Sequence, residues 1–205
     1  MNKIKHQQGY ETPSKIVCVG RNYSEHTKEL NNIQPQSCMF FLKPNSSISD
    51  RLMSTHNNEL LHFETEICFL VHSGNLSSVA FGLDLTKRNL QSHLKKDGLP
   101  WERAKAFDGS AVFSKFVPFK NLNELNIELY IDNSLVQKGH IEEMIYHPNE
   151  ILKEINSFMR LENGDVIMTG TPKGVGEVGT NRLFKGIIKE NEQILIQQEW
   201  VVDKL

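Results

Sequence analysis

Two glutamates that stand one residue apart give the first indication of chemistry in this 205-residue chain. The run LLHFETEICFLV, residues 60–71, is typical of a β-strand, in which alternate side chains share a face, so Glu64 and Glu66 point the same way. Both faces of the run are largely apolar, which indicates a strand covered on both sides. Burying two like charges there costs several kcal/mol unless a cation compensates, and Mg²⁺ or Mn²⁺ prefers such carboxylate oxygens. An exposed edge strand with two solvated glutamates is the alternative.

A third carboxylate, Asp84, follows the apolar stretch 79–83 and precedes a helical pattern. It can complete a set of three oxygen ligands together with the two glutamates. It also stands where an aspartate often caps the N-terminus of a helix, and its position alone favours that second interpretation. The case for a metal site therefore depends on further residues with matching chemistry elsewhere in the chain.

A histidine and a glutamate three residues apart, His26 and Glu29, lie in the segment GRNYSEHTKEL. On a helical turn this spacing places both side chains on one side, within hydrogen-bonding distance. Such a pair can act as a general base and its orienting acid, with the histidine taking a proton from water. A polar surface helix produces the same spacing, so this interpretation stays open as well.

Two further segments carry polar groups in unusual settings. Lys105 lies between two alanines in WERAKAFDGS, where a lysine either extends its ammonium to solvent or is held near a substrate anion. The loop GTPKGVG, residues 170–176, follows a predicted strand and can aim backbone N–H groups and the Thr171 hydroxyl at a carboxylate. A plain turn between strands is the alternative, and the spacing excludes a Walker phosphate-binding loop.

The elements that must position these residues are mainly strands. Apolar runs rich in β-branched residues, flanked by Gly, Pro, Asn or Asp, predict strands at 15–19, 39–42, 64–71, 128–131, 165–169 and 193–198. Helical patterns are fewer and are expected at 23–30, with Ser24 as a possible N-cap, at 86–96 and at 149–158. This balance predicts a β-rich α+β fold and not a doubly wound sheet.

The composition is that of an ordinary globular protein, and we expect a single domain over residues 1–205. A net charge of -2 offers no excess of Lys and Arg for phosphates, so we expect no nucleic-acid partner. The apolar runs are too short to span a bilayer, and the N-terminus lacks the apolar core of a signal peptide. The sequence thus predicts a cytoplasmic protein without a membrane partner. Its three cysteines form no CxxC pair and are expected to be reduced and buried.

Six segments in the same order resemble the fumarylacetoacetate hydrolase superfamily, in particular its short branch of acylpyruvases and oxaloacetate decarboxylases. They are VGRNYSEHTKE, FLKP, HFETE, GLDLTKRNLQ, GLPWERAKAFDGS and GDVIMTGTPKGVG, and they are distributed over most of the chain. Any one of these segments is a weak signal, whereas six in order are a strong one. The resemblance implies a mixed β-roll with a few short helices and a homodimer.

The resemblance also assigns roles to individual residues. It places the Mg²⁺ or Mn²⁺ ligands at Glu64, Glu66 and Asp84, and the catalytic residues at His26, Glu29 and Lys105. The substrate-binding positions it implies are Arg21, Asn22, Tyr23, Arg88, Gln91 and Thr171. One segment departs from the family: where relatives commonly have Gln-x-Gly-Asn-Thr, this chain has QKGHI, residues 137–141. That departure predicts an altered substrate preference or, at the extreme, loss of activity.

The implied activity is metal-dependent cleavage of a C–C bond in a small 2-oxo acid, an acylpyruvate such as acetylpyruvate or fumarylpyruvate. Decarboxylation of oxaloacetate gives the same pyruvate enolate without an attacking water, so one site can support both reactions. The alternatives are an isomerase or decarboxylase of 2-hydroxyhepta-2,4-diene-1,7-dioate type from aromatic catabolism, and a non-catalytic metal-binding or ligand-binding homologue. The dyad of His26 and Glu29 argues against the last, because a pure binder has no use for it.

Overall fold

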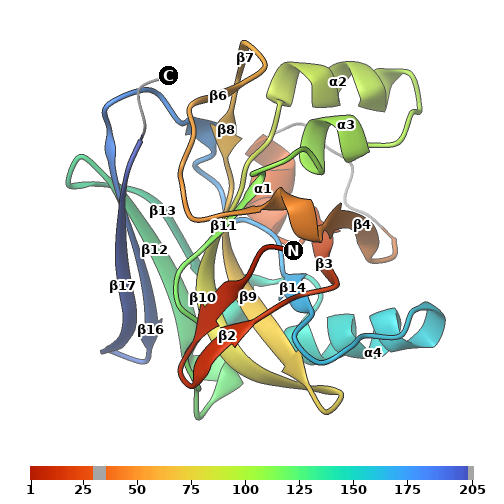
Figure 1. Cartoon of the computed structure of the whole chain (residues 1–205), viewed down its shortest axis with the longest axis vertical. Helices are drawn as coiled ribbons and strands as arrows, with labels where there is room; N and C mark the ends of the chain where they lie inside the picture. The colour runs from red at the N-terminus through yellow and green to blue at the C-terminus, as the bar shows by residue number, and fades with distance from the viewer. Residues whose placement is uncertain (30–35, 203–205) are drawn as a thin grey trace.

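The computed structural model describes residues 1–29 and 36–202, and it has the predicted β-rich α+β fold (Figure 1). The strands are β1 (Ile4–His6), β2 (Gly9–Glu11), β3 (Lys15–Gly20), β4 (Met39–Pro44), β5 (Ile48–Ser49), β6 (Thr55–His56), β7 (Glu59–Leu60), β8 (His62–Phe63), β9 (Thr65–His72), β10 (Asn75–Asp84), β11 (Ala111–Phe113), β12 (Leu125–Ile131), β13 (Ser134–His140), β14 (Val166–Met168), β15 (Gly176–Glu177), β16 (Leu183–Glu190) and β17 (Gln193–Val201). The helices are α1 (Ser24–Glu29), α2 (Arg88–Lys96), α3 (Glu102–Lys105) and α4 (Pro148–Phe158), with 3-10 turns η1 (Asn45–Ser47), η2 (Leu122–Glu124) and η3 (Ile141–Glu143).

Two sheets form the body of the protein. The larger has the order β4-β3-β14-β9-β10-β11-β5, and it is mixed, because β14 pairs parallel with β3 and β11 parallel with β5. The smaller, β13-β12-β16-β17, is antiparallel and lies beside β9 and β10 in Figure 1. The two sheets approach closely at Gly186, where an added Cβ would lie 2.7 Å from the Phe81 ring. A glycine is therefore required there.

Strand β9 explains the apolar run that surrounds the two glutamates. It lies between β14 and β10, and all of its residues except His72 are buried. Ile67 and Phe69 join the core shared with the smaller sheet, whereas Cys68 and Leu70 join a second cluster on the other face. The prediction of a strand covered on both sides is confirmed, and the exposed-edge alternative is wrong.

The helices match the predicted ranges with corrections at their starts. Helix α1 begins at Ser24, and the Thr27 N–H donates to the Tyr23 carbonyl, so Tyr23 and not Ser24 occupies the N-cap position. Residue 30, the predicted end of this helix, lies outside the described residues. Helix α2 begins at Arg88 and not at residue 86, because Thr86 still pairs with His62 in bridge geometry. Its N-cap residue is Lys87, so the interpretation of Asp84 as a helix cap is wrong.

Several elements carried no sequence signal. Helix α3 is only four residues long, too short to show a helical period. Strand β10 begins with the largely polar run NLSS, residues 75–78, so only its apolar second half stood out. Among the described residues, no helix has the length and apolar character needed to cross a membrane. The three cysteines are free and buried, as predicted.

A buried aspartate fixes the start of β14 against β3. The carboxylate of Asp165 accepts hydrogen bonds from the Ser14 hydroxyl (2.7 Å), the Ser14 and Lys15 N–H groups (3.0 and 3.1 Å) and the Glu162 N–H (2.9 Å). Lys15 Nζ lies 2.5 Å from its second oxygen. Burial alone raises the pKa of Asp165, but the hydrogen bonds from Lys15, Glu162 and Ser14 outweigh burial and hold the pKa below its ordinary value.

We expect Asp165→Asn to lower the free energy of unfolding at neutral pH by about 2–3 kcal/mol, since the amide cannot accept all of these bonds. Because the pKa of Asp165 is lower in the folded protein, this stabilisation is present above the ordinary carboxyl range near pH 4 and is lost as the pH falls through the folded pKa. Urea unfolding of both proteins at pH 7 and below pH 4 measures the difference. A difference that stays constant as the pH falls would contradict this role of the carboxylate.

Candidate active site

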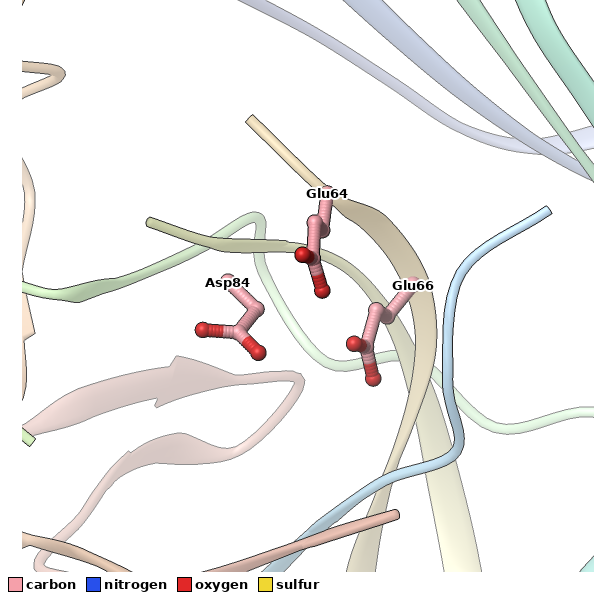
Figure 2. Close-up of side chains that lie close together, drawn as sticks. All are labelled: Glu64, Glu66 and Asp84. Atoms are coloured by element: carbon pink, nitrogen blue, oxygen red, sulfur yellow. The ribbon is translucent and has the colours of Figure 1, made fainter. Parts of the chain in front are cut away.

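Three carboxylates converge where β9 begins and β10 ends. Glu64 stands between β8 and β9, Glu66 follows in β9, and Asp84 is the last residue of β10. The pairing of Thr65 with Leu83, together with a 2.8 Å hydrogen bond from the Asp84 N–H to the Glu64 carbonyl, sets the aspartate beside the glutamates. One oxygen from each side chain lies within 4.8 Å of the others, and the three side chains gather in Figure 2.

Among the described residues, one carboxylate of this buried cluster, Glu66, has no cationic side chain paired with it, which leaves a charge that a bound cation could offset. Glu64, Glu66 and Asp84 are 7%, 1% and 1% exposed. Burial, followed by the charges of Asp84 and Glu64, raises the pKa of Glu66 well above its ordinary value. Within residues 1–29 and 36–202, no Lys, Arg or His forms an ion pair with Glu66. The buried Oδ1 of Asp84 also has no hydrogen-bond partner. Hard cations such as Mg²⁺ and Mn²⁺ bind oxygen sets of this kind.

The Gly170 N–H fixes Glu66 from the opposite side. It donates a 2.7 Å hydrogen bond to Glu66 Oε2, which orients the carboxylate. Gly170 adopts φ +99°, and an added Cβ would lie 2.8 Å from the Cβ of Asn22, so the position requires glycine. The loop 170–176 is therefore part of the site, as its sequence suggested, although this contact is to a carboxylate of the protein.

Lys105 is the cation at the centre of the cluster. Its Nζ donates to Glu64 Oε2 (2.9 Å), Asp84 Oδ2 (2.7 Å) and Thr86 Oγ1 (2.7 Å). Burial lowers the pKa of Lys105, but the charges of Asp84 and Glu64 outweigh it and raise the pKa, so the side chain is an ammonium. It is 2% exposed, and the interpretation of a lysine that reaches solvent is wrong.

A second buried lysine, Lys43, was missed by the sequence assignments. Its side chain is fully buried, and Nζ lies 2.9 Å from Asp84 Oδ1, without hydrogen-bond geometry. The same ammonium donates to the Ser110 carbonyl (3.1 Å), the Ser110 hydroxyl (2.9 Å) and the Lys105 carbonyl. Lys43 thereby connects β4, the end of α3 and Asp84. The signal available was a lysine in the otherwise apolar segment FLKP.

Helix α2 brings two of the predicted substrate-binding residues to the cluster. Arg88 Nη2 donates to Glu64 Oε1 at 2.5 Å, and Arg88 Nη1 donates to Gln91 Oε1 at 2.8 Å. Although burial raises the pKa of Glu64, Lys105 and Arg88 hold it well below its ordinary value. Glu64 is therefore ionised, and Arg88 is the second cation in contact with it.

The predicted dyad is formed. His26 Nδ1 and Glu29 Oε2 are 3.1 Å apart, and the histidine is 5% exposed, so the surface-helix interpretation is wrong for it. The other oxygen of Glu29 accepts a 3.0 Å hydrogen bond from the Gly174 N–H, which ties α1 to the loop 170–176. His26 lines the same small cavity as Glu64 and Lys105.

Three of the predicted substrate-binding residues have different surroundings. The Asn22 amide donates to the Thr169 and Tyr146 carbonyls (2.8 and 3.0 Å) and accepts from the Tyr146 N–H (2.7 Å). Tyr23 is buried in the main core. Thr171 accepts a 2.9 Å hydrogen bond from Gln137 Nε2. None of the three lines the cavity, whereas Arg21, which has a left-handed φ of 60°, does.

The segment that departs from the family is mostly structural. Gln137 is buried, accepts from the Thr65 N–H (3.1 Å) and donates to Thr171 and to the Pro172 carbonyl (2.9 and 2.7 Å). His140 accepts from the Glu142 N–H and caps η3, while Ile141 is buried in the main core. Neither His140 nor Ile141 lines the cavity.

The cavity beside the carboxylates is small. Its volume is about 20 Å³, close to what one water molecule needs. The residues that line it are Val19, Gly20, Arg21, His26, Met39, Phe41, Glu64, Arg88, Gln91, Lys95, Trp101 and Lys105. A small acid can reach the cluster only if some of these side chains move apart.

The chain resembles known proteins over nearly its whole length. The family model described as fumarylacetoacetate (FAA) hydrolase C-terminal matches residues 15–202. The mitochondrial oxaloacetate decarboxylase of Dictyostelium discoideum is 37% identical over 90% of this chain and 91% of its own length. The mitochondrial oxaloacetate tautomerase of Saccharomyces cerevisiae is 36% identical, over 88% and 89%.

Solved structures agree with the fold. A protein from Oleispira antarctica, assigned as a fumarylacetoacetate isomerase/hydrolase, superposes with a TM-score of 0.93 at 32% identity, over 99% of this chain and 100% of that one. The fumarylpyruvate hydrolase of Pseudomonas aeruginosa, in complex with Mn²⁺ and pyruvate, gives 0.85 at 25% identity, over 98% and 96%. These neighbours confirm the mixed β-roll type of fold.

One sequence prediction is overturned by the same relatives. The cytoplasmic location rested on the N-terminus, which shows no signal peptide. The relatives from Dictyostelium discoideum, Saccharomyces cerevisiae and Arabidopsis thaliana are all named as mitochondrial proteins. These names contradict the prediction of a cytoplasmic protein.

Proposed function

Because the chain belongs to the fumarylacetoacetate hydrolase C-terminal family, we propose that it is a metal-dependent enzyme that converts oxaloacetate through its enolate, by tautomerisation or decarboxylation. The observation that carries this proposal is the position of the Lys105 ammonium, 2.9 Å from Glu64 and 2.7 Å from Asp84. Relatives named as oxaloacetate decarboxylase and tautomerase support the substrate. Both reactions create negative charge on the C2 oxygen, and both need a fixed cation there.

Glu64, Glu66 and Asp84 are the residues that would hold the cation, with Mg²⁺ or Mn²⁺ as the expected ion. When bound, it would supply Lewis-acid polarisation of the 2-oxo group. The Gly170 N–H keeps the Glu66 carboxylate oriented through its 2.7 Å hydrogen bond. Lys43, 2.9 Å from Asp84, keeps the aspartate facing Lys105.

Lys105 acts in the reaction as a fixed positive charge and not as a general base. Its pKa is raised, so it keeps its proton at neutral pH and can donate a hydrogen bond to the developing enolate oxygen. Arg88 and Gln91, joined by a 2.8 Å hydrogen bond, present adjacent guanidinium and amide groups. A guanidinium suits the carboxylate of a 2-oxo acid, because it can bind both oxygens at once.

A substrate panel tests this proposal. We expect the protein with Mg²⁺ or Mn²⁺ to accelerate at least one of two reactions above the uncatalysed rate. These are the conversion of the enol form of oxaloacetate to its keto form and the release of pyruvate from oxaloacetate. Acetylpyruvate and fumarylpyruvate, assayed in parallel, measure the hydrolase activity. An enzyme that is silent on oxaloacetate but cleaves an acylpyruvate would reject the proposed substrate.

Acylpyruvate hydrolysis is the second candidate, and the His26–Glu29 pair favours it. A histidine oriented by a glutamate 3.1 Å away can take a proton from a water molecule that attacks the distal carbonyl. The fold neighbour that binds Mn²⁺ and pyruvate is itself a fumarylpyruvate hydrolase. One site therefore suits both reactions, with the dyad needed for the hydrolytic one.

We expect His26→Ala to reduce acylpyruvate hydrolysis about 100-fold or more, since general-base catalysis typically contributes that much. The effect on oxaloacetate decarboxylation should be smaller, because that reaction needs no activated water. Rates of pyruvate release from both substrates by the same preparation give the comparison. Equal losses on both substrates would contradict this division of roles.

We also propose that the working unit is a single catalytic domain over residues 1–205 and that it forms a homodimer, as the family resemblance implies. Sedimentation of the purified protein measures the mass directly. A monomer with full activity would reject the dimer.

A further inference from the structure

Three polar side chains follow one face of helix α2. Arg88, Gln91 and Lys95 are separated by three and four residues, the spacing that aligns side chains along a helix. All three line the cavity that also contains Glu64 and Lys105. Lys95 is thus one turn beyond the two predicted substrate-binding residues, on the same face. No role was assigned to it from the sequence.

Aromatic rings connect Lys95 to the centre of the site. Lys95 Nζ lies 4.8 Å from the centroid of the Trp101 ring, and Trp101 lies 6.1 Å from the Phe41 ring. On the other side, Lys105 Nζ lies 5.4 Å from the Phe41 centroid. Two ammonium groups therefore rest against two neighbouring rings of one wall, Lys105 at the carboxylates and Lys95 farther from them.

The charge of Lys95 has no counterion among the described residues, since no carboxylate there lies within ion-pair distance of Nζ. Burial, followed by the positive charges of Arg21 and Arg88, lowers the pKa of Lys95 to about 8. The acidic charge that acts on it is Glu64, which is already paired with Arg88 and Lys105. This part of the cavity therefore has an excess of positive charge that an anionic ligand would neutralise.

We propose that Lys95 binds the distal carboxylate of a dicarboxylic 2-oxo acid and so selects dianionic substrates over monocarboxylic ones. This inference rests on the proposed function, because the cluster of Glu64, Glu66, Asp84 and Lys105 must hold the 2-oxo acid end of the same molecule. Oxaloacetate is a substrate of this kind. Lys95 then acts as a specificity residue, while Lys105 acts at the reacting end.

A purely structural role for Lys95 makes a different prediction. The residue lies in the last turn of α2, where a cation interacts favourably with the helix dipole, and the Trp101 contact also contributes to stability. In that case its loss would weaken the fold, or all ligands alike. A ligand pair that differs only in the distal group separates the two roles.

Oxaloacetate and 2-oxobutyrate form such a pair, because a methyl group in the second replaces the C4 carboxylate of the first. With the Mn²⁺-loaded full chain, we expect Lys95→Met to raise KM for oxaloacetate about tenfold or more and to change kcat much less. Inhibition by 2-oxobutyrate should stay within about twofold of wild type. Lys95→Arg should keep most of the preference, and Lys96→Met, at the exposed neighbouring position, should behave as wild type.

The inference would be overturned if Lys95→Met weakened the binding of both ligands equally, or if its effect were no larger than that of Lys96→Met. In either case the wild type would still turn over oxaloacetate, so the proposed function would stand. If the wild type does not turn over oxaloacetate, the proposed function fails. Calorimetric binding of the same two ligands then still decides the role of Lys95, since the subsite predicts a selective loss of affinity for the dianion.

Discussion

Glu66→Gln is expected to lower oxaloacetate turnover by at least about 100-fold, because it removes one of three charges that hold the cation. The substitution keeps the shape of the side chain and an oxygen that can accept the 2.7 Å hydrogen bond from Gly170. It also relieves repulsion among three buried carboxylates, so the metal-free protein should be at least as stable as wild type. The effect should therefore fall on metal binding and not on the fold.

Thermal unfolding with and without Mn²⁺ provides the second measurement. Wild type should gain stability from the ion, since a ligand that binds only the folded state raises the unfolding temperature, and Glu66→Gln should lose most of that gain. Glu199→Gln, an exposed carboxylate on β17, serves as the matched control. An unchanged Mn²⁺ effect in Glu66→Gln would remove this residue from the ligand set.

Lys105→Met should have the next largest effect, a loss of about 100- to 1000-fold in turnover, comparable to removal of a preorganised donor from an oxyanion site. Its ammonium makes three hydrogen bonds, to Glu64, Asp84 and Thr86. Without it, the buried carboxylates lose a counter-charge, so the metal-free protein should be destabilised by roughly 3–5 kcal/mol. Mn²⁺ should still bind and restore much of that stability.

If Lys105→Met still binds Mn²⁺ but loses turnover, the lysine takes part in catalysis and is not needed to assemble the metal site. Lys115→Met, at an exposed lysine outside the cavity, controls for general effects of the substitution. If Lys105→Met abolished Mn²⁺ binding as well, the lysine would be a structural part of the metal site. Turnover near the wild-type rate would exclude Lys105 from the chemistry.

The sequence was sufficient to predict the elements near the acidic pair. The period-two pattern of residues 60–71 and the apolar residues on both faces predicted a buried strand, and β9 has that character. The pattern could not place Asp84, because its approach to Glu64 and Glu66 depends on the register between β9 and β10. A strand register follows from packing across the whole sheet, so the position of Asp84 alone favoured a helix cap, and the family resemblance was needed to place it among the ligands.

Residues that act through long-range contacts were the hardest to identify. Lys43 reaches Asp84 from β4, and nothing in the local pattern shows that two segments 41 positions apart will meet. The sequence assigned no role to Lys95, and only the cavity distinguishes it from the exposed Lys96. Asn22 shows the opposite case. The family resemblance assigned it to substrate binding, but its side-chain amide donates hydrogen bonds to the main-chain carbonyls of Thr169 and Tyr146.

The relatives also changed which reaction we propose first. Acylpyruvate cleavage came first in the sequence interpretation, because the motifs resemble the branch of acylpyruvases and oxaloacetate decarboxylases. The curated relatives at 36–37% identity are named instead for oxaloacetate. The proposed site would accommodate both reactions, because Lys105 and a cation held by the three carboxylates would stabilise an enolate however it is formed.

The most direct test of a metal-dependent oxaloacetate enzyme is its rate of oxaloacetate conversion through one cycle of metal removal and return. The protein is assayed as purified, after treatment with EDTA and dialysis, and after titration with Mn²⁺ or Mg²⁺. We predict that turnover is lost in the metal-free protein and returns with saturation as the ion is added, in wild type but not in Glu66→Gln. Undiminished turnover by the metal-free protein, or no turnover at any ion concentration, would contradict the account.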